Sequence, residues 1–66
     1  MKMKVSEFLK LLYTDIQMVR LLEYYDGNDE GKELFYGEAA KAMKSEYSKR
    51  TIESFIPGYD LTIYLE

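Results

Sequence analysis

A chain of 66 residues without a single Cys or His can hold its fold together only by packing. Chains this short bury only about 60% of the surface that their unfolded form exposes, which leaves room for one core. The composition excludes disulfides and the usual zinc sites, which reinforce many domains of this size. We therefore expect residues 1 to 66 to form one compact domain that carries no metal or cofactor.

Two features of the composition bear on where such a domain works. Hydrophobic residues make up 47% and charged residues 32%, a mixture typical of globular and not of disordered chains. The N-terminal stretch MKMKVSEFLKLLY lacks the apolar run and cleavage site of a signal peptide, and no segment approaches the roughly 18 apolar residues of a membrane span. The absence of Cys suits a reducing compartment. We expect a soluble, cytoplasmic domain that does not engage membranes.

The N-terminal third predicts a short helix over residues 6 to 14. Ser6 is a candidate N-cap, because its hydroxyl can accept from a free amide of the first turn, and Glu7 places a negative charge where the helix dipole favours it. Apolar residues recur at spacings of three and four: Val5, Phe8, Leu9, Leu12 and Ile16. This stripe should face a sheet.

A hairpin is expected next. The run QMVRLLEYY, residues 17 to 25, is rich in strand-forming residues and places Val19 and Leu21 on the face opposite Arg20. The segment DGNDEG at 26 to 31 has the composition of a turn, and LFY at 34 to 36 reads as the returning strand.

The second half predicts another helix and another hairpin. Gly37 ends the first hairpin, and strong helix formers at 38 to 47 place Ala39, Ala42, Met43 and Tyr47 at helical spacing. RTIESFI at 50 to 56 is strand-like and PGYD supplies a turn. In LTIYLE at 61 to 66 every second residue is apolar, so one face of that strand should be buried: Leu61, Ile63 and Leu65.

The order α-β-β-α-β-β predicts an α+β fold, with a small antiparallel sheet of three to four strands and two helices packed on one face. Three strands, with LFY irregular, is the alternative.

Charge is unevenly distributed along the chain. Residues 23 to 38 contain six acids and one base, Lys32, a net of −5, whereas residues 39 to 50 contain four bases and one acid, a net of +3. Seven tyrosines are more than so small a core can bury with every hydroxyl satisfied, and tyrosine is enriched in protein interfaces. We therefore predict a partner-binding surface on the first hairpin, made by Glu23, Tyr24, Tyr25, Asp26, Asp29, Glu30, Glu33 and Tyr36.

Other chemistries find less support in the residues. Asp26, Asn28 and Glu30 before Gly31 resemble the start of a calcium-binding EF-hand loop, but the closing acid of that loop would fall on Gly37. No nucleophile, dinucleotide or metalloprotease motif occurs, so the chain is expected not to be an enzyme. The formal net charge of −3 argues against direct nucleic-acid binding.

Three alternatives stay open at this point. The basic stretch with Lys41 and Lys44 is a second candidate for the working surface. Glu23 and Glu33 could face each other across the hairpin as a carboxylate pair. The chain could also be a structural or accessory protein that self-associates as a homodimer through a sheet edge or an aromatic face.

The succession VSEFLKLL, VRLLEYYD, LFYG and RTIESFI with LTIYLE resembles small proteins of bacteriophages and bacterial mobile elements. The resemblance covers nearly the whole chain and rests on length and hydrophobic pattern. It implies a protein-binding role in the host cell cytoplasm, such as anti-CRISPR-type inhibition of a host defence protein that itself binds nucleic acid. It assigns no functional residue.

Overall fold

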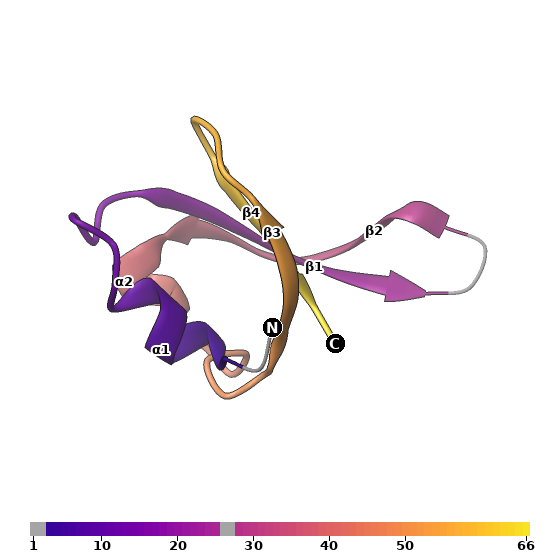
Figure 1. The fold of residues 1–66 in the computed structure, drawn as a ribbon, viewed down its shortest axis with the longest axis horizontal. Coiled ribbons are helices and arrows are strands. Elements are labelled where there is room, and N and C mark those ends of the chain that lie inside the picture. The colour runs from indigo at the N-terminus through magenta and orange to yellow at the C-terminus, as the bar shows by residue number, and fades with distance from the viewer. Residues whose placement is uncertain (1–2, 26–27) are drawn as a thin grey trace.

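The computed structural model describes residues 3–25 and 28–66, and for 24–25 and 28–30 it describes the backbone alone. It contains one four-stranded sheet and two short helices, so the predicted α+β class is confirmed (Figure 1). The elements in chain order are α1 (Val5–Leu9), β1 (Met18–Tyr25), β2 (Asn28–Glu38), α2 (Ala39–Ala42), β3 (Ile52–Ile56) and β4 (Leu61–Leu65).

The sheet is mixed, whereas the sequence predicted an antiparallel one. Its strand order is β2-β1-β4-β3, and β4 runs parallel to β1, from Val19 opposite Leu61 to Glu23 opposite Leu65. Both hairpins are antiparallel, as expected. The strand β4 has a fully covered apolar face and lies at the centre of the sheet, beside β1, whereas β3 is largely exposed and lies at the edge. Alternation along a strand fixes its faces but not its direction relative to a distant strand.

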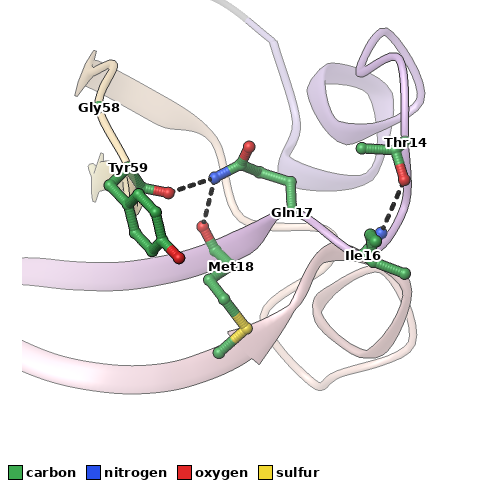
Figure 2. A pocket seen from close by; sticks show the side chains of 6 residues that line it. All are labelled: Thr14, Ile16, Gln17, Met18, Gly58 and Tyr59. Carbon is green, nitrogen blue, oxygen red and sulfur yellow. Dashed lines mark hydrogen bonds between the residues drawn. The ribbon is translucent and has the colours of Figure 1, made fainter.

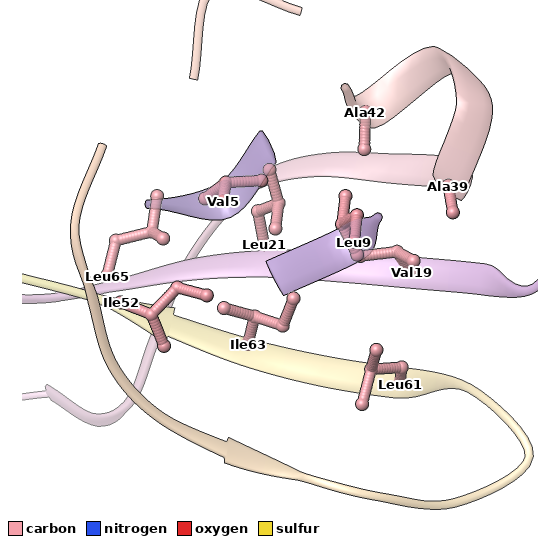
Figure 3. Packing of buried hydrophobic residues seen from close by; sticks show 10 residues of the cluster. All are labelled: Val5, Leu9, Val19, Leu21, Ala39, Ala42, Ile52, Leu61, Ile63 and Leu65. Atoms are coloured by element: carbon pink, nitrogen blue, oxygen red, sulfur yellow. The ribbon is translucent and has the colours of Figure 1, made fainter. Parts of the chain in front are cut away.

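The core lies on the face of the sheet that carries Val19 and Leu21 (Figure 3). The inward prediction for β4 is confirmed, since Leu61, Ile63 and Leu65 are all buried. Leu12 and Met43 are half-buried and pack on the cluster. The remaining buried members come from both helices, β1 and β3: Val5, Leu9, Val19, Leu21, Ala39, Ala42 and Ile52.

The first helix is shorter than predicted and starts earlier. Its N-cap is Lys4, not Ser6, and the Lys4 amide donates to Glu7 Oε1 at 3.0 Å. Long-range backbone bonds replace a hydroxyl cap, since the Val5 amide donates to the carbonyl of Arg50 at 3.0 Å. From Leu11 on, the amides bond at three-residue spacing, to Phe8 and then to Leu9, so the helix ends. The predicted stripe therefore does not reach Ile16, which is 66% exposed.

The second helix is also shorter than the predicted 38 to 47. It forms one turn, and Ser45 explains its early end. The Ser45 hydroxyl donates to the Ala42 carbonyl at 2.7 Å and accepts from the Tyr47 amide at 3.2 Å, so a side chain competes with the helical ladder. Turns with three-residue spacing then lead to Arg50.

The strand β2 begins six residues before the predicted LFY. The predicted turn at 26 to 31 is wrong for Asn28 to Gly31, which belong to the strand, with Asn28 paired to Tyr25. Residues 26–27 of that prediction lie outside the described part of the chain. Gly31 has φ of 83°, a left-handed conformation that non-glycine residues rarely adopt. The register shifts between Leu21 and Leu22, which bends the hairpin.

The helices span five and four residues, about one turn each, and are too short to cover the sheet as a layer. That they pack together on one face of it stays a prediction. Within residues 3–25 and 28–66, no helix is long and apolar enough to cross a membrane.

Candidate functional site

The predicted site hairpin extends past the body of the sheet. β4 accompanies β1 only as far as Glu23, whereas the β1–β2 pairing continues to Tyr25 and Asn28. Figure 1 shows this end of the hairpin standing away from the helices as a two-stranded ribbon. Of the predicted site residues, the backbones of Tyr24 and Tyr25 lie in β1 and those of Asp29 and Glu30 in β2. Asp26 lies outside the described residues.

We call residues 24–31 the hairpin tip. Its sequence holds three acids and no base. It contains five of the residues predicted for the site: Tyr24, Tyr25, Asp26, Asp29 and Glu30. Because no third strand accompanies it in the described sheet, both strands of the tip are edges. A ribbon that projects beyond the body of the sheet is accessible to another molecule, which suits it to contact one.

Glu23 belongs to the base of the hairpin and is held by an arginine from a distant segment. Arg50 donates from one terminal nitrogen to Glu23 Oε2 at 2.7 Å and to the carbonyl of Glu66 at 2.8 Å. Both side chains of the ion pair are about one-third exposed. Glu23 thus anchors the hairpin to the C-terminal strand, and its charge is balanced within the molecule.

Glu33 and Tyr36 lie together beside Arg20, on the face of the sheet away from the core. Arg20 Nε is 2.8 Å from Glu33 Oε1, an ion pair in which the N–H does not point at the carboxylate. The Arg20 guanidinium lies 4.8 Å from the centre of the Tyr36 ring, and the Tyr36 hydroxyl donates to Asp60 Oδ2 at 3.1 Å. We call Arg20, Glu33, Tyr36 and Asp60 the Arg20 cluster.

Electrostatics in the Arg20 cluster act on the tyrosine. The hydrogen bond to the Asp60 carboxylate raises the pKa of Tyr36 above its ordinary value of 10.0, because that bond requires the protonated phenol. Desolvation adds to the shift, and the nearby Arg20 charge opposes it. The Tyr36 phenol therefore stays protonated at neutral pH and keeps its hydrogen bond to Asp60.

The structure excludes the proposed carboxylate pair. Glu23 is paired with Lys32, and Glu33 with Leu22, so the two glutamates are adjacent in register and their side chains point to opposite faces. The calcium-loop alternative also disagrees with the geometry, since Asn28–Glu38 is a strand and not a coordinating loop. Within the described ranges, no three acidic, His or Cys side chains come together where they could hold a metal ion.

The basic stretch is less uniform than its sequence indicates. Lys41 lies in α2, but Lys44 follows the end of that helix, and both are exposed. Arg50 is committed to Glu23 and to the C-terminal carbonyl. The stretch therefore presents lysines from a helix turn and the loop after it, and not a continuous basic helix.

The sequence reasoning missed a shallow hollow at the end of the sheet remote from the hairpin tip. It has a volume of about 380 Å³ and is lined by Thr14, Ile16, Gln17, Met18, Gly58 and Tyr59 (Figure 2). The Gln17 side-chain amide donates to the Tyr59 carbonyl at 2.8 Å and to the Met18 carbonyl at 3.1 Å. These bonds join the loop before β1 to the β3–β4 turn. The only local signal was PGYD, which predicted a turn and no binding surface.

Comparison with known proteins found no relative, so the function is argued from the geometry of this chain. No family model, curated protein or solved structure matches it.

Proposed function

We propose that this chain is a non-catalytic protein-binding domain whose hairpin tip docks against a basic surface of its partner. The observation that carries the proposal is the extension of the β1–β2 ribbon beyond β4, which presents Tyr24, Tyr25, Asp29 and Glu30 on a projecting element.

The charge of the tip supports this choice of partner. At the base of the hairpin, Glu23 and Glu33 have arginine partners, Arg50 and Arg20. The three acids of the tip have no base between them in the sequence, so the end of the ribbon carries the negative charge of the hairpin. Such a patch steers association with a positively charged groove.

The tyrosines supply the apolar part of the proposed contact. A tyrosine brings a large, stiff surface and a hydrogen-bonding tip, and such residues often anchor protein interfaces. Tyr24 and Tyr25 are consecutive in β1, so the projecting ribbon carries two tyrosines side by side in its sequence.

In the phage-type role that the sequence pattern implies, the basic surface would belong to a host defence protein, and the tip would occupy the groove that normally takes nucleic acid. The partner would then be a nucleic-acid-binding protein, and nucleic acid should compete with this chain for the partner's groove.

The experiment captures partners with the immobilised domain from a lysate of its host cell and then titrates the captured protein. Asp29→Lys combined with Glu30→Lys should abolish binding while the thermal midpoint is kept, because charges at the end of a projecting hairpin contribute little to stability. Lys41→Glu combined with Lys44→Glu is the matched control and should leave binding intact. Raising salt from about 50 to 500 mM should slow the on-rate markedly.

Tyrosine variants test the anchor. Tyr25→Ala should weaken binding by on the order of 2 kcal/mol if it is a central contact, whereas Tyr13→Ala, at the far end of the molecule, should not. Loss of binding in the lysine control, with the tip variant still active, would move the working surface to the basic stretch.

A further inference from the structure

Large apolar side chains are exposed at the end of the molecule opposite the hairpin tip. The loop between α1 and β1 and the β3–β4 turn meet there, joined by the Gln17 side chain. Tyr13 and Tyr59 are 102% and 97% exposed, so their rings pack against nothing in the described part of the chain. Leu11 and Ile16 are 70% and 66% exposed in the same loop. We call these four residues the loop patch.

The hollow lies within the loop patch. Ile16 and Tyr59 belong to both, and Met18 adds a third apolar wall. Gln17 uses its amide N–H groups on the Met18 and Tyr59 carbonyls, and its Oε1 accepts no hydrogen bond from the described part of the chain. The hollow therefore offers apolar walls and one acceptor, which suits a tyrosine ring with its hydroxyl.

We propose that a second copy of this chain covers the loop patch, with Tyr13 of each copy inserted into the hollow of the other. A two-fold interface requires that one surface carry both the projecting group and the cavity that receives it. Here the exposed Tyr13 precedes Thr14, Ile16 and Gln17, which line the hollow, so one loop carries both the projecting ring and a wall of the hollow. The Tyr13 hydroxyl donates to Gln17 Oε1 of the second copy.

Charge complementarity supports a second copy over an unrelated partner. Lys10 and Asp15 lie at the two ends of the loop, both exposed, and neither forms an ion pair within residues 3–25 and 28–66. A two-fold axis near Tyr13 brings the start of one loop beside the end of the other. Lys10 of each copy then meets Asp15 of the other, which gives two symmetric ion pairs.

The area available is sufficient for a dimer. Each tyrosine can bury about 150 to 250 Å², and with Leu11 and Ile16 the loop patch offers on the order of 600 Å² per copy. The total of about 1,200 Å² stands at the lower end of specific protein interfaces. Because β1 runs from the loop patch toward the hairpin tip, the dimer would present its two tips at opposite ends, with two partner-binding sites.

Sedimentation velocity over a range of concentrations tests the proposal. The wild-type chain should show a reversible monomer–dimer equilibrium, and Tyr13→Ala should raise the dissociation constant at least tenfold without lowering the thermal midpoint, since the side chain is exposed. Lys10→Asp alone and Asp15→Lys alone should each weaken the dimer, and Lys10→Asp combined with Asp15→Lys should restore it.

Other results overturn it. A chain that stays monomeric up to millimolar concentration has no such interface. If Tyr13→Ala leaves the dimer intact but Ile56→Lys abolishes it, the β3 edge and not the loop patch joins the two copies. If the double charge exchange fails to restore a dimer that the single changes weaken, the proposed pairing of the loops is wrong. None of these outcomes depends on the hairpin-tip partner.

Discussion

Arg20 and Tyr36 face each other across β1 and β2, with the guanidinium carbon 4.8 Å from the centre of the tyrosine ring. The Tyr36 hydroxyl donates a hydrogen bond to Asp60, which directly precedes β4. One arginine thus links three segments on the face of the sheet away from the core, and the cation–π contact orients the ring toward its acceptor.

The raised pKa of Tyr36 predicts how the phenol titrates. Because the folded-state pKa lies above the unfolded value of 10.0, the Asp60 bond stabilises the fold below that pH, and the contribution is lost as pH rises through the folded value. An ultraviolet tyrosinate titration of Asp60→Ala should show one phenol shifted toward 10.0, with Tyr36→Phe identifying its signal. An unchanged titration of Tyr36 in Asp60→Ala would show that the bond is not formed in solution.

Replacing Ile63 with Ala should destabilise the domain by about 2 to 5 kcal/mol, because this side chain is fully buried at the centre of the cluster. Urea denaturation measures the loss, and incomplete folding of the variant at low denaturant counts as the same result. Leu11→Ala is the matched control and should change stability by less than about 0.5 kcal/mol, since Leu11 is exposed. Equal effects of the two truncations would contradict the assigned core.

The Arg50–Glu23 ion pair should contribute modestly. Both side chains are about one-third exposed, so solvent screens the pair, and a double-mutant cycle with Arg50→Ala and Glu23→Gln should give a coupling of about 0.5 to 1 kcal/mol. Arg50→Ala alone should cost more than Glu23→Gln alone, because it also removes the bond to the Glu66 carbonyl. The exposed neighbour Lys49→Ala should be neutral. Strict additivity would mean that the pair does not persist in solution.

Gly31 should not tolerate a side chain. Its φ of 83° is left-handed, and an added Cβ would lie 3.3 Å from the Glu23 carbonyl, so Gly31→Ala should cost about 1 to 2 kcal/mol. At Gly58, which is not left-handed, an added Cβ meets the Asp60 carbonyl at an ordinary 3.5 Å, and Gly58→Ala should be nearly neutral. Chemical denaturation compares the two, and a harmless Gly31→Ala would refute the backbone conformation.

Millimolar calcium should leave the thermal midpoint unchanged. The acid that would close an EF-hand loop is replaced by Gly37, and Asn28–Glu38 is committed to a strand. Thermal melts with calcium and with a chelator check this. Saturable stabilisation that disappears in Asp26→Ala would establish a cation site at the turn.

The sequence alone determined the features that depend on local periodicity. The alternation of Leu61, Ile63 and Leu65 fixed the buried face of β4, and Val19 and Leu21 opposite Arg20 fixed that of β1, because a strand sends successive side chains to opposite faces. The α+β class followed from the same patterns.

Tertiary structure decided the rest. The helix α2 ended early because the Ser45 side chain competes for its hydrogen bonds, and α1 started earlier than predicted because the carbonyls of Ser48 and Arg50 accept from its first amides. No helical pattern encodes either effect. The parallel contact of β1 with β4 joins segments far apart in the sequence, since Val19 and Leu61 are 42 positions apart. The ion-pair partners of Glu23 and Glu33 also come from other segments of the chain. The hollow beside Gln17 exists only where two loops meet. Local preference sets which face a residue takes, but packing of distant segments sets which residue it meets.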